Sequence, residues 1–183
     1  MSFTIPASLG IRTHGTPRGS FAHVLSEHGL PTTRREDWRY TRLRGFELEQ
    51  FGAPAAVGSL QEAQILPHVL EKTAGQLVFV DGVFQSQLSI LPTQPGIRLE
   101  HLVGKSFSPR PLPQGELEIA PMLALNGALA NQGTTIHVAP NTRVRNAIEL
   151  VWITTPSSGV YGFHPVVDVE IGRHAEVTII ERH

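Results

Sequence analysis

Hydrophobic and polar positions alternate in the C-terminal half of the chain, and the pattern repeats there at an offset of about 33 residues. The stretch 135–144 superposes on 168–177, and in each the β-branched residues form one row and the polar residues the other. This is the period-two pattern of a half-buried strand. The matched apolar pairs are Ile136 with Val169, Val138 with Ile171, and Val144 with Val177. The sequence therefore predicts the same strand, turn and second strand twice.

Turn-forming residues follow the first strand of each copy, Ala139-Pro140 in one and Gly172-Arg173 in the other. Between the copies, 148–153 is apolar at nearly every position, which predicts a strand covered on both faces. Strands that return to the same lateral position after one circuit are typical of a parallel β-helix, whose coils must stack to bury their inner faces. A β-sandwich or jelly roll can produce the same pattern.

The N-terminal part combines a loose arm with short helices. Residues 1–19 contain too many Gly and Pro residues for a helix. Ser20 is the expected N-cap of a helix that ends at Gly29, and one face of this helix carries Phe21, Val24, Leu25 and His28. The capping-box spacing that begins at Ser59 predicts a second helix, kinked by Pro67.

A small sheet and a connector should follow. Asp81-Gly82 lies between apolar runs and predicts a hairpin with a type I′ turn. The alternating stretch 97–102 is expected to add a strand to the same sheet, and the proline-rich 106–115 is expected to be an extended connector. A short helix around 122–129 would then cover the first coil of the β-helix.

These elements predict an α+β, mainly β protein with two domains. Residues 1–115 would form an N-terminal helical region with a small hairpin sheet, and residues 116–183 the first coils of a right-handed parallel β-helix that looks truncated.

Composition excludes several kinds of chemistry. The 183 residues include 15 basic and 16 acidic side chains without a basic stripe, which argues against nucleic acid or an anionic membrane as a partner. The chain has no cysteine, so disulfides, thiolate nucleophiles and thiolate-bound clusters are ruled out. Neither phosphate-binding glycine motif is present. No apolar run spans a bilayer and no secretory segment follows Met1, so we expect a cytoplasmic protein.

Nine histidines raise the question of a metal site, but none shows the spacing of a known metal motif. His137 belongs to an outward row, His164 precedes Pro165, and His174 lies in the second turn. Asn141 and His174 would lie one coil apart and could hydrogen-bond to each other. We therefore assign no metal ligand and no catalytic residue, and any residue that binds a cofactor is unknown.

Two other functions stay open. In a cupin-like metal-dependent enzyme, His137 and His164 would be ligands at a barrel mouth. In a glycan- or peptide-binding β-helix, Trp152, Tyr161 and Phe163 would form an exposed platform, although packing in the core and loops is the interpretation of these aromatics that we favour.

Charge concentrates around Trp38 in the stretch 29–43. Taken alone, Glu36 and Asp37 beside several arginines indicate a solvated or locally paired face, and Trp38 a packing anchor. However, the stretch resembles a motif near the N-terminus of SufD-like proteins, which belong to the SufB/SufD family of the SUF iron-sulfur cluster assembly machinery. The matching residues are Pro31, Arg35, Glu36, Trp38, Tyr40, Thr41 and Leu43.

Further stretches resemble the same family in collinear order from Leu30 to the end. Residues 77–89 resemble its hairpin. Four later stretches resemble the opening of its β-helix: 124–129, 133–140, 164–165 and 175–181.

The resemblance implies a scaffold component of iron-sulfur cluster assembly, part of a SufBCD-type complex and not an enzyme by itself. Its implied partners are a SufB-like paralogue, which pairs through the β-helices, and a SufC-like ATPase, which binds a C-terminal helical region. The chain alone would bind no cofactor, and an iron-sulfur cluster, with flavin as a further candidate, would belong to the assembled complex.

The family's functionally implicated histidine and its SufC-binding helices correspond to parts beyond His183, so the chain resembles the N-terminal portion only. An uncovered last coil would expose unpaired backbone groups and an apolar interior. We therefore expect self-association through this open end.

Overall fold

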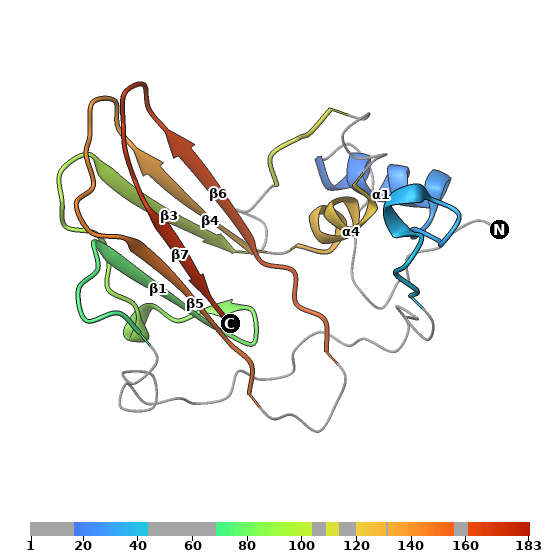
Figure 1. Ribbon diagram of the computed structural model, residues 1–183, viewed down its shortest axis with the longest axis horizontal. Coiled ribbons are helices and arrows are strands. Elements are labelled where there is room, and N and C mark those ends of the chain that lie inside the picture. The colour runs from blue at the N-terminus through green and yellow to red at the C-terminus, as the bar shows by residue number, and fades with distance from the viewer. Residues whose placement is uncertain (1–16, 44–68, 104–108, 114–119, 131, 156–160) are drawn as a thin grey trace. The chain divides into compact units, whose positions relative to one another are not determined.

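The computed structural model describes residues 17–43, 69–103, 109–113, 120–130, 132–155 and 161–183 (Figure 1). The helices are α1 (Pro17–His28), η2 (Glu36–Trp38), η5 (Ser86–Leu88) and α4 (Pro121–Leu129), of which η2 and η5 are single 3₁₀ turns. The strands are β1 (Gly75–Val80), β2 (Val83–Phe84), β3 (Ile97–Val103), β4 (Gln132–Val138), β5 (Ile148–Ile153), β6 (Val166–Ile171) and β7 (Ile179–Arg182). The protein is thus a mixed α/β protein.

The chain divides into two compact units whose segments interleave in sequence. We call residues 1–53, 103–132 and 158–166 the helical unit, and residues 54–102, 133–157 and 167–183 the strand unit. A division along the sequence at residue 115 is not tested by this grouping and stays a prediction.

Helices α1 and α4 pack against each other and form the core of the helical unit. Its buried residues are Phe21, Ala22, Val24, Leu25, Ala124, Leu125 and Ala128. Gly127 allows the close approach, because a Cβ there would lie 2.6 Å from the ring of Phe21. At the end of α1, Gly29 has a φ of 68° and its N–H donates to Leu25 O, as the sequence predicts for a glycine cap.

Helix α1 differs from the sequence prediction in two respects. It begins at Pro17 and not after Ser20, because proline suits the first turn of a helix, where its missing N–H has no intrahelical partner. His28, expected on the apolar face, is exposed. The helix predicted from Ser59 lies outside the described residues, as do residues 106–108 and 114–115 of the predicted connector.

The strand unit contains two open sheets that share one core. One sheet has the order β2-β1-β5-β7 and the other the order β3-β4-β6. Strands β1, β5 and β7 are parallel, whereas β2 is antiparallel to β1. The shared core contains Leu77, Phe79, Ile136, Val138, Val144, Ile148 and Leu150. Because β5 is covered on both faces, its first four residues are buried, as predicted.

The hairpin predicted at Asp81-Gly82 is present, and both residues have the positive φ of a type I′ turn, 49° and 76°. Strand β3, by contrast, does not join the hairpin sheet. It pairs with β4, since Ala139 N donates to Gly96 O at one end of the pair and His101 contacts Thr134 at the other. The two strands therefore run in opposite directions (Figure 1).

The repeat seen in the sequence is two strand-turn-strand passages, β4 to β5 and β6 to β7. Strands β4 and β6 are neighbours that run in the same direction (Figure 1), and β5 and β7 are parallel neighbours in the other sheet. Strand β5 is accordingly the second strand of the first copy and does not lie between the copies. Each passage carries the chain from one sheet to the other.

Backbone hydrogen bonds hold the two turns together in register. Asn141 N donates to Arg173 O at 3.0 Å, and Gly172 N donates to Val138 O at 2.8 Å. Asn141 and His174 occupy equivalent positions, each with a φ near 60° (58° and 59°), a conformation in which Asn and His are enriched. The connection between the turns is therefore made by backbone groups, and the side-chain bond expected between Asn141 and His174 stays a prediction.

The second copy is more exposed than the first. Val138 is fully buried, whereas its match Ile171 is 54% exposed. The difference follows from the sheet order, because β6 and β7 have a neighbouring strand on one side only among the described residues. Self-association through this edge stays a prediction.

The close stacking of the turns predicts that Gly172→Ala destabilises the protein. A Cβ at this position would lie 2.4 Å from Pro140 N, so backbone must shift. We expect the free energy of unfolding, measured by urea denaturation, to fall by about 2 kcal/mol. The exposed Thr178→Ala in the same copy should change it by less than about 0.5 kcal/mol. Equal effects of the two variants would contradict the close approach.

Candidate functional site

Three ion pairs connect the two copies, and the members of each pair are 33 positions apart. We call them the cross-copy pairs: His137 with Glu170, Arg143 with Glu176, and Glu149 with Arg182. The first pair lies on the first strands of the repeat, β4 and β6, and the third lies on the second strands, β5 and β7. The second pair lies between them, where Arg143 is bridged to Glu176, and we call this place the corner. The 33-residue offset that aligns the apolar residues therefore also brings the first two pairs together. Glu149 and Arg182 lie on strands that pair at an offset of 31, so this third pair is diagonal across β5 and β7.

The first pair lies on the outward row of β4 and β6. His137 Nδ1 is 3.1 Å from Glu170 Oε2, and both side chains are partly exposed to solvent, 37% and 51%. The outward position of His137 confirms the alternation predicted from the sequence. An exposed pair of this kind contributes little to stability by itself, but it favours one register over its neighbours.

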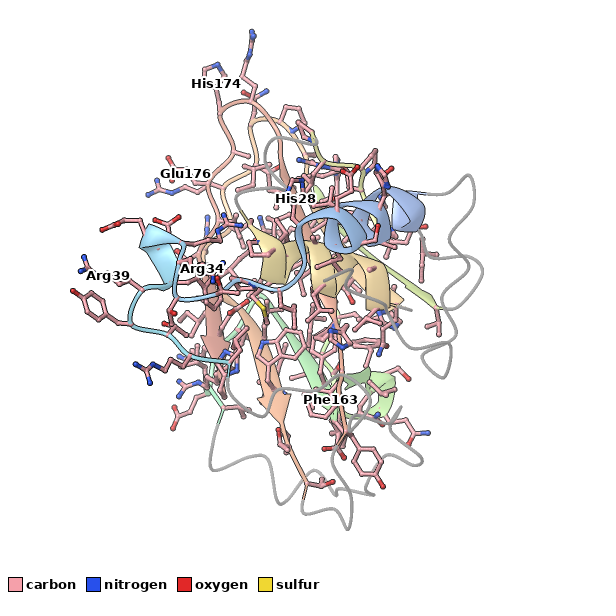
Figure 2. The ribbon with its side chains drawn as sticks, turned by 90° about the vertical axis from the view of Figure 1, so that its right-hand side faces the viewer. His28, Arg34, Arg39, Phe163, His174 and Glu176 are labelled. Carbon is pink, nitrogen blue, oxygen red and sulfur yellow. The ribbon has the colours of Figure 1, made fainter. Side chains whose placement is uncertain are left out.

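The second pair lies at the corner and is the most exposed. Arg143 Nε is 3.0 Å from Glu176 Oε2, with the two side chains 82% and 68% exposed. Figure 2 shows Glu176 below the projecting turn that carries His174 at its tip. Backbone bonds from Val144 N to Glu176 O and from Glu176 N to Thr142 O fix the corner independently of the ion pair.

The repeat changes its spacing after this corner. Ile148 pairs with Ile179, which is 31 positions later, because the first copy has two more residues than the second between the corner and the second strand. An open groove of about 500 Å³ lies here, lined by Arg143, Val144, Arg145, Glu176, Val177 and Thr178. The two copies are therefore offset by 33 positions up to this corner and by 31 positions along β5 and β7.

The third pair contains the only fully buried carboxylate among the described side chains, that of Glu149, the second residue of β5. One oxygen of Glu149 accepts a hydrogen bond from Arg182 Nε, and the other accepts one from Leu70 N at 3.0 Å. A buried carboxylate is stable only when it is paired and hydrogen-bonded. Glu149 therefore connects β5 to β7 and to the segment that precedes β1.

Sequence reasoning missed this pair, although a signal was available. Glu149 interrupts an apolar strand at a position that should be covered, and a basic residue, Arg182, follows at the repeat offset of 33. It also missed Asp81 beyond its role in the turn. The Asp81 carboxylate accepts bonds from the backbone N–H and the hydroxyl of Thr155, which connects the hairpin to the end of β5.

The histidines are dispersed among different local partners. His101 Nδ1 lies 2.7 Å from Thr134 Oγ1, and its ring is 4.6 Å from that of Phe84. His174 is exposed at its turn, and His137 is engaged with Glu170. Among the described residues, no group of three potential metal-ligating side chains occurs. The cupin-like alternative also requires a closed barrel, whereas the two sheets formed by the described strands are open.

Burial lowers the pKa of two histidines, His101 and His164, from the ordinary value of about 6.5. Both rings therefore favour the neutral form in the folded protein. His164 belongs to the helical unit and precedes Pro165, whose carbonyl oxygen accepts a bond from Asn126 on α4.

Aromatic rings follow the strand order across one sheet. Phe84, Phe79 and Trp152 lie on β2, β1 and β5, and the Phe79 and Trp152 rings stack at 4.2 Å. His183 is parallel to Trp152 at 6.4 Å. Trp152 is thus part of the core of the strand unit, which is the packing interpretation allowed by the sequence. Of the other residues proposed for a glycan platform, Tyr161 is partly buried and Phe163 is 36% exposed.

The charged stretch around Trp38 is a surface of the helical unit. Trp38 is partly buried, in agreement with a packing anchor, whereas Glu36 and Asp37 are exposed. Tyr40 is 92% exposed and lies beside the guanidinium of Arg39.

Comparison with known proteins identifies a relative in Escherichia coli (strain K12), the iron-sulfur cluster assembly protein SufD, with 31% identity over 159 residues. The alignment covers 86% of this chain and 36% of the relative. The chain therefore spans about a third of that protein's length. No protein-family model matches the chain. Among the described residues, no helix has the length and apolar character needed to cross a membrane.

The difference in burial along the cross-copy pairs predicts unequal effects of two matched variants. Arg182→Met leaves the buried Glu149 without its cation, and should lower the free energy of unfolding by about 2 kcal/mol. Arg143→Met removes an exposed cation of the same type, and should change it by less than about 0.5 kcal/mol. Urea denaturation measures both. Adding Glu149→Gln to Arg182→Met should recover part of the loss, and no recovery would contradict a charge-based effect.

The lowered pKa values of His101 and His164 predict that stability falls as the pH is lowered below about 6.5. In that range the two histidines bind protons in the unfolded chain but stay neutral in the folded protein. Protonation therefore favours unfolding. The stability that the neutral rings contribute should be fully present above the unfolded pKa of about 6.5. It should be lost as the pH falls toward the lower pKa values that His101 and His164 have in the folded protein. His101→Gln should reduce the slope of unfolding free energy against pH between 6.5 and 5, and adding His164→Gln should reduce it further. An unchanged slope in the double variant would show that His101 and His164 do not cause the pH dependence of stability.

Proposed function

We propose that this chain is a SufD-like member of the SufB/SufD family and a scaffold component of iron-sulfur cluster assembly. The observation that carries the proposal is the 31% identity to SufD, which extends over 86% of this chain. The collinear stretches from Leu30 to the C-terminal end support the same assignment. As a scaffold, the chain would contribute binding surfaces and no catalytic step of its own.

We further propose that the strand unit forms the first coils of a right-handed parallel β-helix. Three features support this: the parallel pairing of β5 with β7, the neighbouring turns at Asn141 and His174, and the cross-copy pairs at a constant offset. In such a fold each coil buries the inner face of the next, which accounts for the buried first copy and the more exposed second copy.

The partners in this proposal are a SufB-like paralogue and a SufC-like ATPase in a SufBCD-type complex. An iron-sulfur cluster would be the cargo of the assembled complex, and this chain alone would hold neither the cluster nor a flavin. The resemblance assigns SufC binding to a C-terminal helical region and SufB binding to the β-helix, so SufB-like binding is the function that we propose for the strand unit.

The proposal predicts that the immobilised chain captures a purified SufB-like protein from the same organism but not the SufC-like ATPase. A longer SufD-like chain that includes the C-terminal helical region serves as the positive control and should capture both. If the chain captures neither protein while the control captures both, the proposed scaffold role does not belong to this stretch.

A matched pair of variants locates the contact. Ile171 on β6 and Leu123 on α4 are exposed apolar residues of different units, 54% and 45% exposed. If the strand edge binds the partner, Ile171→Lys should reduce capture at least about tenfold, whereas Leu123→Lys should leave it unchanged.

A further inference from the structure

The described surface of the helical unit contains a short segment in which several arginines and an exposed aromatic ring are close together in sequence. We call residues 32–42 the arginine segment. It contains four arginines, Arg34, Arg35, Arg39 and Arg42, and two acidic residues, Glu36 and Asp37. Three of the arginines, Arg34, Arg39 and Arg42, are exposed, and Arg39 projects away from the ribbon in Figure 2.

The segment is held in one conformation by its own backbone. Successive turns are closed by hydrogen bonds from Arg35 N to Thr32 O, from Trp38 N to Arg35 O, and from Thr41 N to Trp38 O. Pro31 at the start is buried, and Trp38 in the middle is partly buried. Because the backbone is ordered before binding, a partner would not have to order it, which lowers the entropic cost of association.

Tyr40 is the second notable feature, because 92% of its surface is exposed. The Arg39 guanidinium lies 5.8 Å from the centroid of its ring, a distance at which a cation attracts the face of an aromatic ring. Tyrosine and arginine are the residue types enriched at the energetic centres of protein interfaces. An exposed pair of this kind on an ordered backbone is therefore suited to contact another protein.

The charges of the segment indicate the chemistry of that partner. Arg34, Arg39 and Arg42 make no ion pair with any carboxylate within the described part of the chain. The guanidinium fork matches carboxylates in a bidentate arrangement. Phosphate is the other anion that arginine binds well, but nucleic-acid binding depends on an excess of positive charge, and the whole chain has a net charge of −1.

We propose that the arginine segment is a docking site for an acidic protein segment, in which carboxylates pair with Arg34, Arg39 and Arg42 and an apolar side chain packs against Tyr40. The site belongs to the helical unit, whereas the strand edge belongs to the strand unit, and the proposal does not depend on the proposed role in cluster assembly.

The test is selection from a random peptide display library on the full-length chain, followed by fluorescence anisotropy with the recovered peptides. The recovered peptides should be rich in Asp and Glu around one or two apolar residues. Binding should weaken at least about tenfold in Arg34→Glu/Arg39→Glu and severalfold in Tyr40→Ala. It should also weaken with added salt.

The matched control is Arg173→Glu/Arg143→Glu, which makes the same charge change at exposed arginines of the strand unit and should leave peptide binding unchanged. Circular dichroism checks that every variant is folded. Recovery of no acidic peptides, or equal losses in both double variants, would overturn the proposal. So would a thymidine oligonucleotide that competes for the same arginines and binds more tightly than the selected peptides.

Discussion

The register between the two copies of the repeat is the constraint on which the strand unit depends. Backbone bonds between the turns, such as Asn141 N to Arg173 O, align the two copies before any side chain is considered. A slip of one residue would move each inward side chain of the second copy to the outward row and separate all three cross-copy pairs. The apolar and the polar residues therefore favour the same register. A sequence has one preferred structure when its different interactions favour the same arrangement in this way.

Burial decides how much each cross-copy pair matters. At the corner, Arg143 and Glu176 are surrounded by water, so most of their attraction is screened and the backbone bonds alone determine the geometry. On β5, Glu149 is fully buried, and the loss of either hydrogen-bond donor would leave a charge in an apolar environment. Oppositely charged residues from the two copies thus influence the register weakly at the exposed pair Arg143–Glu176 and strongly at the buried pair Glu149–Arg182.

Local signals in the sequence predicted local structure well. The Asp81-Gly82 turn, the Gly29 cap and the alternation around His137 depend on neighbours within a few residues, and the structure contains all three. The sheet that β3 joins could not be predicted in this way, because that choice depends on β4, more than 30 positions later. The offset of the repeat in the candidate site could be predicted from the sequence. The burial of Glu149 could not, because it depends on contacts among three segments that are far apart in the sequence, those of Leu70, Glu149 and Arg182.

The two units use their charged residues differently. In the strand unit the repeat places opposite charges beside each other, so Arg143 and Arg182 are engaged within the chain. In the arginine segment the backbone forms hydrogen bonds between its own turns, and Arg34, Arg39 and Arg42 are exposed to solvent, as is Tyr40. Exposed cations contribute almost nothing to folding, so stability does not explain their concentration beside an ordered aromatic ring. Association with another protein does, because desolvation on binding strengthens both the ionic and the aromatic contacts.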